Sequence, residues 1–348
     1  MNEPAHNAGR EIERPLSICD QENTPLCVRS NSEQLPIAAA LPRELLIQDV
    51  ERLPSQCQLL TTNEFTVFQV YAEQIPHLMH EIGRLREISY RLEGEGCGRS
   101  LDLDRFDQTY VHLLLWSQHK QELAGAYRIA KADQIIARDG KQGLYTHTLF
   151  RYDDWLLQAM GPALELGRSF IRLEYQRHYS ALLLLWKGIA LMIAKEPHYR
   201  TLFGAVTISN EYSDLSQRLL ESFLRTYHFD PVWAQGVIAR NPPPRNFERA
   251  FKDDERLRNV RTVDQLSEMI ADIEPDHKKV PILLKQYLKL GGRMLSFNVD
   301  NDFSDVIDGL IAVDLLGIDQ RHVVRLLGSE AAERFLIHHG RKLMRKAG

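Results

Sequence analysis

The chain has 348 residues, of which 44% are hydrophobic and 26% charged, a composition typical of a soluble globular protein with one large or two ordinary domains. Its formal net charge of −4 gives no general reason to bind nucleic acid. The four cysteines contain no C-x-x-C pair, which argues against a zinc ribbon and suits a reducing cytoplasm. They are Cys19, Cys27, Cys57 and Cys97.

The first 41 residues are polar and follow no sustained period, so the sequence predicts a mobile N-terminal arm, 1–41, with no apolar signal core. The most apolar run is "SALLLLWKGIALMIA", 180–194, which Lys187 interrupts. This run is shorter than the roughly 20 residues needed to span a bilayer. A buried helix is therefore the better interpretation.

Helices and strands alternate after the arm. Helical spacing predicts helices at 42–53 and 75–93, and β-branched and aromatic residues predict a strand at 64–72. Next comes "GEGCGRSLDLDRFD", 94–107, in which the glycines end the preceding helix. Two strands, 110–117 and 122–131, then form a hairpin.

The segment "GPALELGRSFIRLEY", 161–175, is predicted to be a long strand with an irregularity. Strict alternation would place Glu165 and Arg168 on opposite faces. A glycine inside a strand often marks a bulge, and one extra residue at Gly167 would bring both side chains to the same face.

The rest of the chain continues the alternation and then becomes charged and basic. Expected helices lie at 179–195, 213–228 (with Ser213 as N-cap) and 280–291, and expected strands at 201–209, 293–299 and 309–316. The segment 249–279 is expected to be a charged helical excursion or lid, and 317–348 a basic helical tail. This order predicts an α+β (α/β/α) fold whose main domain spans 42–316.

Familiar ligand loops do not match "GEGCGRSLDLDRFD". An EF-hand starting at Asp102 would place Phe106 at position 5 and Leu113 at position 12, where calcium requires oxygen ligands. The glycines follow a helix, whereas a dinucleotide fingerprint requires a strand before them. A P-loop would need Gly-Lys-Ser/Thr, which is absent.

Asp104 and Asp107 lie three residues apart, so one turn would point both inward beside Phe106, while Asp102 is expected to face solvent. Buried carboxylates need cationic partners. Candidates are Arg86, Arg128 and Arg168, with Arg84, Arg91 and Arg99 nearby, so the pairing stays open.

Glu165 lies in an apolar strand and has two interpretations. Left unpaired, it would have a raised pKa that suits a general base. Paired with Arg168, it would be a neutralised structural group. His147 and His178 are isolated, so no metal site is expected, and the esterase motif G-x-S-x-G is absent.

Several strings, taken in order, resemble the acyl-carrier-protein-dependent branch of the GNAT N-acyltransferases. The nearest group is the ornithine- and glycine-lipid N-acyltransferases, often called hemolysin-like, which are related to the acyl-homoserine-lactone synthases. The strings cover roughly residues 42–315 and include "EIGRLREISYRLEGEGCGRSLDLDRFD", "LAGAYRI", "LELGRSFIRLEYQRHYSALLLLWKGIA", "LFGAVTISNEYS" and "VPILLKQYLKLGGR". The resemblance implies a GNAT-like, mostly antiparallel sheet with a bulge in the strand that carries Glu165.

The resemblance also implies a set of site residues. For the reaction itself, Glu165 is our candidate general base, and Tyr212 is either the proton donor to the leaving thiolate or a packing tyrosine. The expected acceptor pocket consists of Arg86, Tyr90, Asp104, Asp107, Arg128 and Arg168. The expected path for the acyl chain and pantetheine runs along Phe170, Tyr175, Arg177 and Trp186. The glycine loop that binds the coenzyme A pyrophosphate is missing after Glu174, which favours acyl carrier protein as the donor.

The implied reaction moves a long-chain, 3-hydroxylated acyl group from the 4'-phosphopantetheine of acyl carrier protein to the α-amine of an amino acid such as ornithine or glycine. It would be the first step of aminolipid synthesis, with no bound cofactor. The alternative is a synthase of a diffusible N-acyl amino acid or acyl-homoserine-lactone signal. The expected location is cytoplasmic or peripheral at the inner membrane face, and the basic tail is a candidate contact for the carrier protein or the membrane.

Overall fold

A single large sheet organises the described part of the chain. The computed structural model describes residues 34–243, 260–300 and 306–343. In these residues eight strands pair in the order β1-β2-β3-β4-β6-β7-β10-β9. Their bounds are β1 Gln58–Thr61, β2 Phe65–Tyr71, β3 Val111–Ser117, β4 Glu122–Lys131, β6 Ala163–Ile171, β7 Thr201–Ile208, β9 Arg293–Asp300 and β10 Val306–Asp314. Every neighbouring pair is antiparallel except β6 and β7, and the predicted α+β, GNAT-like fold is confirmed.

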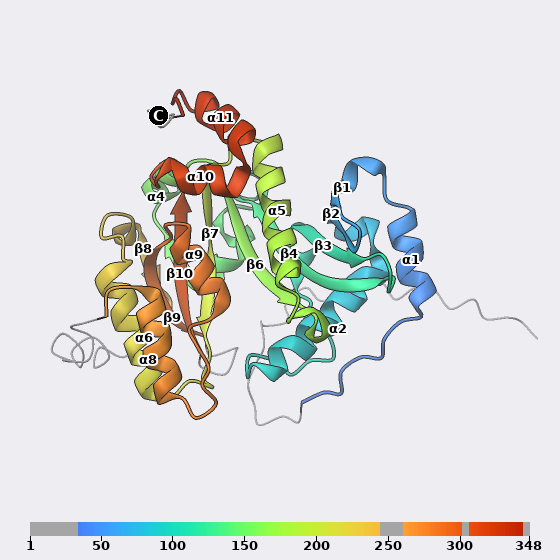
Figure 1. Cartoon of the computed structure of the whole chain (residues 1–348), viewed down its shortest axis with the longest axis horizontal. Coiled ribbons are helices and arrows are strands. Elements are labelled where there is room, and N and C mark those ends of the chain that lie inside the picture. Colours follow the sequence, from blue (N-terminus) through green and yellow to red (C-terminus); the bar gives the residue numbers. More distant parts are fainter. Residues whose placement is uncertain (1–33, 244–259, 301–305, 344–348) are drawn as a thin grey trace, which may run out of the picture.

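Helices cover both faces of this sheet and make three layers (Figure 1). One face packs against α5 Tyr179–Lys195, α6 Asp214–Tyr227, α8 Val263–Ile273, α9 Ile282–Lys289, α10 Gln320–Leu327 and α11 Ser329–His338. The other face packs against α1 Arg43–Glu51, α2 Pro76–Leu92, α3 Ala132–Asp139 and α4 Asp154–Met160. Because β3 lies between the two helical layers, all of its residues are buried, which explains its continuous apolar run "VHLLLWS".

The parallel strands β6 and β7 pair only over a short stretch. Ala163–Glu165 pair with Thr201–Phe203, after which β6 continues beside β4 and β7 continues beside β10. The two strands therefore part in the middle of the sheet. At this junction a Cβ on Gly204 would lie 2.1 Å from the carbonyl oxygen of Leu166, so only glycine fits the close approach.

A bulge follows on β6, as the sequence predicts. Ala126 and Arg128 of β4 pair with Phe170 and Gly167 of β6, so β6 carries one extra residue between the two pairs. Arg168 has a φ of +46°, which places the irregularity one residue after Gly167. The strand ends at Ile171 and a 3-10 turn follows at Leu173–Tyr175, so the predicted strand 161–175 is too long at its end.

The predicted segments outside the sheet have different outcomes. The arm 1–41 lies outside the described residues up to position 33, and the excursion 249–279 up to position 259. The tail is helical in its described part, and Val323, Ala332 and Phe335 pack into the same core as α5. Within residues 34–343, apart from the two undescribed gaps, no helix has the length and apolar character to cross a membrane.

Several short elements carried no clear sequence signal. They are β1, α3, α4 and the two-stranded sheet of β5 Phe150–Tyr152 and β8 Val237–Ala239. Each is only a few residues long, so neither periodicity nor capping separates it from a loop.

The close approach of β6 and β7 can be tested by Gly204→Ala. Because the added methyl group would meet the Leu166 carbonyl at the junction, we expect the free energy of unfolding to fall by about 1–3 kcal/mol. Chemical denaturation measures this change. Gly167→Ala is the matched control, since its Cβ meets nothing within 4 Å, and it should shift stability by less than about 1 kcal/mol. Equal stability of the two variants would contradict the tight junction.

Candidate active site

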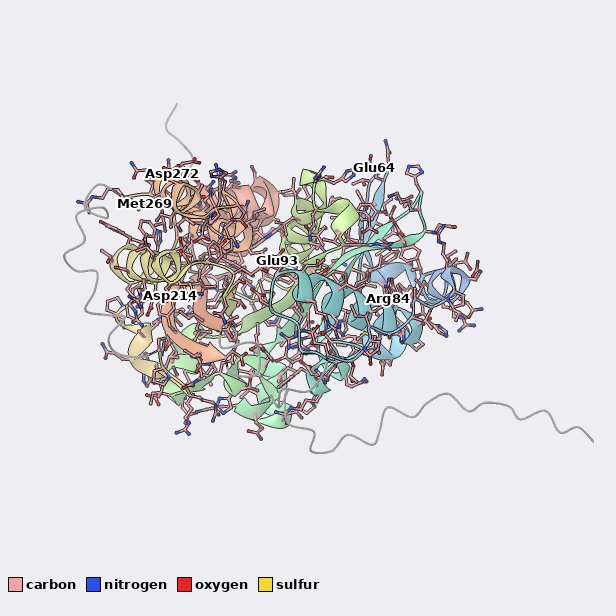
Figure 2. The ribbon with its side chains drawn as sticks, turned by 90° about the horizontal axis from the view of Figure 1, so that it is seen from below. Glu64, Arg84, Glu93, Asp214, Met269 and Asp272 are labelled. Carbon is pink, nitrogen blue, oxygen red and sulfur yellow. The ribbon has the colours of Figure 1, made fainter. Side chains whose placement is uncertain are left out.

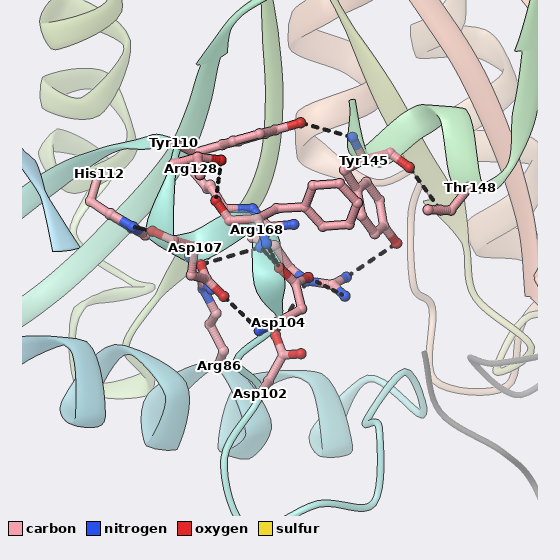
Figure 3. Close-up of polar contacts among 12 residues, drawn as sticks. Arg86, Asp102, Asp104, Asp107, Tyr110, His112, Arg128, Tyr145, Thr148 and Arg168 are labelled. Atoms are coloured by element: carbon pink, nitrogen blue, oxygen red, sulfur yellow. Dashed lines mark hydrogen bonds and ion pairs between the residues drawn. The ribbon is translucent and has the colours of Figure 1, made fainter. Parts of the chain in front are cut away.

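Three arginines and three aspartates lie together beside the bulge, and their side chains are at most 10% exposed (Figure 3). Arg86 on α2 lies 2.8 Å from a carboxylate oxygen of Asp107. Nη1 of Arg128 on β4 lies 2.5 Å from Oδ1 of Asp104 and 3.2 Å from Oδ1 of Asp107. Removing charges from water is costly, so such a group is stable only when the opposite charges are close and well hydrogen-bonded. The predicted inward direction of both aspartates is what the structure shows.

Local hydrogen bonds hold this acidic turn. Asp104 Oδ1 accepts the amide of Phe106, and Asp107 Oδ2 accepts the amide of Asp104, which forms a capping box around the 3-10 turn Arg105–Gln108. Phe106 is buried and anchors the turn. Spacing and burial thus fix both carboxylates in the interior.

The expectation that Asp102 faces solvent is wrong. Asp102 is buried, and its carboxylate lies 3.4 Å from Nε of Arg168. Its backbone amide donates to the carbonyl of Gly83, which ties this part of the loop onto α2. The third aspartate thereby balances the third arginine, and burial raises the pKa of Asp102.

The pKa values in this cluster follow from burial and neighbouring charge. Burial alone would raise the pKa of Asp107, but Arg86 and Arg128 hold it well below its ordinary value. His112 donates Nε2–H to the backbone carbonyl of Asp107 at 2.8 Å. Burial lowers the pKa of His112 from 6.5 to about 4, so the ring is neutral at pH 7.

Glu165 lies on the same face of the sheet, but three donors occupy its carboxylate. The Tyr110 hydroxyl donates to one oxygen, and the backbone amides of Tyr145 and Thr146 donate at 3.2 and 2.6 Å. Burial raises the pKa of Glu165, and these donors oppose the rise. Glu165 therefore holds the segment of Tyr145, whose ring lies against the Arg168 guanidinium at 4.9 Å.

A cavity of about 610 Å³ occupies the space where β6 and β7 part. Its apolar wall includes Tyr127, Leu166, Leu182, Leu185, Val206, Val280, Leu283 and Tyr287. Its polar end includes Tyr90, Glu93, Glu95, Tyr145, Arg168, Thr207, Asp300 and Asp308. The cavity is thus amphiphilic: one part fits a hydrocarbon chain and the other fits a charged group.

The predicted site residues divide between the cavity wall and a layer behind it. The wall contains Tyr90, Arg168, Phe170, Tyr175 and Tyr212. Behind Arg168, and not in the wall, lie Arg86, Asp104, Asp107 and Arg128, and Glu165 is likewise outside the wall.

Two residues of the predicted acyl path also lie away from the wall. Trp186 packs edge-on against Tyr287 at 5.2 Å, one layer behind it, and Arg177 is exposed.

Tyr212 is in the wall, and its hydroxyl donates to the carbonyl of Lys279 at 2.6 Å.

Four acidic side chains of the wall had not been predicted. Glu93 and Glu95 come from the loop after α2, and Figure 2 shows Glu93 near the middle of the molecule, between the N-terminal and C-terminal elements. Asp300 ends β9 and Asp308 lies in β10. The available signal was an acidic residue inside or at the end of an apolar strand, in "SFNVD" and "VIDGLIAVD".

Side chains that could bind a metal do not gather in the described ranges 34–243, 260–300 and 306–343. No group of three or more His, Cys, Asp or Glu residues has a suitable arrangement there. Cys57 and Cys97 are both buried, and the Cys97 thiol donates to Glu87 Oε2 at 3.0 Å.

Comparison with known proteins identifies the family. Residues 85–187 match the model of the Acetyltransferase (GNAT) domain. The glycine N(alpha)-acyltransferase of Bacteroides thetaiotaomicron is 30% identical over 274 residues, which are 73% of this chain and 79% of that protein. This chain belongs to the GNAT N-acyltransferase family. It is therefore an acyltransferase, as the sequence predicts.

One further relative and one solved structure are also similar to this N-acyltransferase. The L-ornithine N(alpha)-acyltransferase of Rhodobacter capsulatus is 29% identical over 231 residues, which are 64% of this chain and 78% of that protein. The solved structure of FeeM, an N-acyl amino acid synthase from uncultured soil microbes, is 13% identical and covers 74% of this chain and 93% of its own, with a TM-score of 0.38.

The neutral His112 of this N-acyltransferase predicts a specific pH dependence of stability. Its folded pKa is depressed, so below pH 6.5 the unfolded chain binds a proton that the folded chain takes up only near pH 4. The free energy of unfolding should therefore fall as the pH drops from 6.5 to 4, by on the order of 3 kcal/mol from this residue. Denaturation at several pH values measures the slope.

His112→Gln keeps a hydrogen-bond donor but cannot titrate, so the slope between pH 6.5 and 4 should become shallower. His178→Gln is the control, because it removes an exposed histidine and leaves His112 in place. Parallel curves for the parent and His112→Gln would show that His112 is already charged in the folded protein.

Proposed function

We propose that this enzyme transfers a long-chain, 3-hydroxylated acyl group from the phosphopantetheine of acyl carrier protein to the α-amine of an amino acid such as glycine or ornithine. The product is an N-acyl amino acid, a lyso-aminolipid. The observation that carries the proposal is the amphiphilic cavity between β6 and β7, in which an apolar wall continues into a charged end. A long acyl chain fits the apolar wall and a charged amino acid fits the polar end, so this pair of substrates uses both parts of the cavity.

The shape of the sheet supports a pantetheine-borne donor. Beyond Glu165 and Phe203 the two strands no longer pair with each other, so their facing backbone edges turn toward the cavity. The amides of an extended pantetheine arm can bond to such edges as an added strand does. After Glu174 the chain reads "YQRHYSALLLLW", which offers no glycine cradle for the pyrophosphate of coenzyme A. This favours the carrier protein as donor.

Arg168 is the proposed binding residue for the acceptor carboxylate. It lies in the cavity wall, and Asp102 and Asp104 hold its guanidinium from behind at 3.4 and 3.8 Å. Tyr212 lies in the same wall, and its hydroxyl, turned away from the Lys279 carbonyl to which it donates, is the proposed proton donor to the departing thiolate. The other ion pairs position Arg168 and do not contact substrate.

The carrier protein is expected to dock near the start of α5. His178 and Leu182 of this end are in the cavity wall, whereas the basic tail contacts the other end, where His339 bonds to the carbonyl of Pro197 at 2.8 Å. A helix of 17 residues separates the two ends by about 25 Å. The tail's charge is also partly neutralised, because Arg321 pairs with Asp319. The tail is therefore the weaker docking candidate.

The proposal is tested with purified protein and the same 3-hydroxyacyl group loaded on carrier protein or on coenzyme A. Glycine, ornithine and homoserine-lactone precursors serve as acceptors, and mass spectrometry identifies the amide. We expect an N-acyl amino acid from the loaded carrier protein, and much slower transfer from coenzyme A. A folded enzyme that forms no amide with any amino acid would refute the proposal, and a lactone product would establish the signalling alternative.

The role of Arg168 predicts a change in the apparent affinity for the acceptor. Arg168→Lys keeps the charge but loses the planar fork that matches a carboxylate, so KM for the amino acid should rise about ten-fold or more. KM for the acyl donor should change less. Arg177→Lys is the matched control, since Arg177 is exposed and away from the wall. Equal KM values for the acceptor in parent and Arg168→Lys would exclude Arg168 as its binding residue.

A further inference from the structure

The proposed reaction needs a base that can reach the amine. An amino-acid amine is mostly protonated at pH 7, and it attacks a thioester only after it loses a proton. Glu165 is poorly placed for this task, because three donors occupy its carboxylate and it is not in the cavity wall. We therefore expect the base to be one of the carboxyl groups that line the cavity.

Asp308 is a carboxyl group with a defined position at the polar end. It lies on β10 beside Thr207 of β7, whose hydroxyl donates to Asp308 Oδ1 at 2.8 Å. Glu165 pairs with Phe203, so the two carboxyl groups lie four residues apart along β7, which is about 13 Å. Phe203, Thr207 and Asp308 share one face of the sheet, so Asp308 is on the face of Glu165, and unlike Glu165 it lines the cavity.

Asp300 on the neighbouring strand completes a carboxyl pair. It is also in the cavity wall, and only 6% of its surface is exposed against 4% for Asp308. Asp300 pairs with Val306 and Asp308 with Asn298, so the two aspartates are diagonal neighbours on one face of the sheet. Two buried carboxyl groups in contact cannot both be ionised at low cost, so the pair retains a proton more readily than an isolated aspartate does. Such a pair can take up and release a proton near neutral pH.

We propose that Asp308, paired with Asp300, accepts the proton of the acceptor ammonium group while Arg168 binds the acceptor carboxylate. This rests on the proposed function. The zwitterion of an amino acid then lies between a cation on β6 and a carboxyl pair on β9 and β10. Asp308 is a catalytic residue in this arrangement, whereas Glu165 is a positioning residue that acts through Tyr145.

The charges around Asp308 support this role. Burial, followed by the negative charge of Asp300, raises the pKa of Asp308 to about 7, and Arg168 opposes the rise. A base with this pKa is half ionised at neutral pH, the condition for efficient proton transfer. The other charged or titratable groups of the wall at this end are Tyr90, Tyr145, Glu93, Glu95 and Lys279.

Glu95 is a competing carboxyl group in the same wall. Burial, followed by Asp308 and Glu93, raises the pKa of Glu95 to about 8, so it is mostly protonated at pH 7. It lies in the loop after α2, whereas strands β7 and β9 orient Asp308. Both its protonation and its position make it the weaker base.

The proposed step moves two protons, forms one bond and breaks another. Asp308 takes one proton from the ammonium group, the neutral nitrogen forms a C–N bond to the thioester carbonyl, and the C–S bond breaks. The second proton of the nitrogen goes to the leaving thiolate of the pantetheine, through Tyr212. Asp308 returns its proton to water, so the amide nitrogen retains one hydrogen and no oxidant or reductant is required.

Asp308→Asn tests the proposal, because the amide can still accept the Thr207 bond. At pH 7 we expect kcat/KM for the acceptor to fall at least 100-fold. The deficit should shrink toward pH 10, because the fraction of neutral amine rises about ten-fold for each pH unit below the amine pKa. The parent should show an acidic limb near pH 7 that is absent from the variant. An Asp308→Asn enzyme with the parental rate and limb would overturn the proposal.

Asp300→Asn gives an independent readout that a merely structural role would not produce. Removing the negative charge beside Asp308 lowers its pKa, so the acidic limb should move to lower pH. Glu165→Gln and Glu95→Gln are the comparison variants, and each should keep the limb at its parental position. Loss of the limb in either comparison variant would move the role of base to that residue.

Failure of the proposed function gives a different pattern. In that case the parental enzyme forms no amide with any amino acid at any pH, and variants cannot differ from it. Melting temperatures of all variants confirm that the compared proteins are folded.

Discussion

The parting of β6 and β7 is the constraint on which the rest of the site depends. The two strands are held together at the Gly204 junction and then follow different neighbours, so an otherwise continuous sheet opens in its interior. Both helical layers remain intact on either side, so this opening is lined by backbone edges and side chains and is not filled by a packed core. Residues from strands distant in sequence thereby meet around one cavity.

The buried ion pairs follow from this opening. Arg168 must present a cation to the cavity from a strand that is otherwise buried, and an isolated guanidinium there would be costly. Asp102 and Asp104 balance it, and Arg128 and Arg86 in turn balance Asp104 and Asp107. The network is equal in charge, three cations against three anions. Arg168 differs from the other five residues in its position. The bulge, where Arg168 has a φ of +46°, turns its side chain toward the cavity.

Much of this arrangement could be predicted from local pattern. The helix 75–93, the hairpin 110–131 and the bulge after Gly167 each leave a signal in periodicity or in a single glycine. The direction of Asp104 and Asp107 followed from their spacing around Phe106. Asp102 could not be placed in this way, because its burial depends on the backbone bond to Gly83 and on the distant Arg168. The prediction for Asp102 failed because its partners are distant in sequence, not because of the chemistry of its side chain.

Sequence separation also explains why the sequence predicts a role for Glu165 and none for Asp308. A glutamate within an apolar strand beside an arginine is conspicuous in sequence, but its role depends on which groups meet its oxygens. Three donors from the Tyr110 side chain and the segment 145–146 meet the Glu165 oxygens, which is why we propose a positioning role for Glu165 beside the Tyr145 ring. Asp308 is ordinary in sequence, and becomes distinctive only because the pairing of β7, β10 and β9 places Thr207 and Asp300 on either side of it, at a cavity facing Arg168. In the proposed mechanism, burial alone therefore does not distinguish the carboxylate that takes the proton from the one that positions a neighbour; remaining hydrogen-bonding capacity and access to the cavity do.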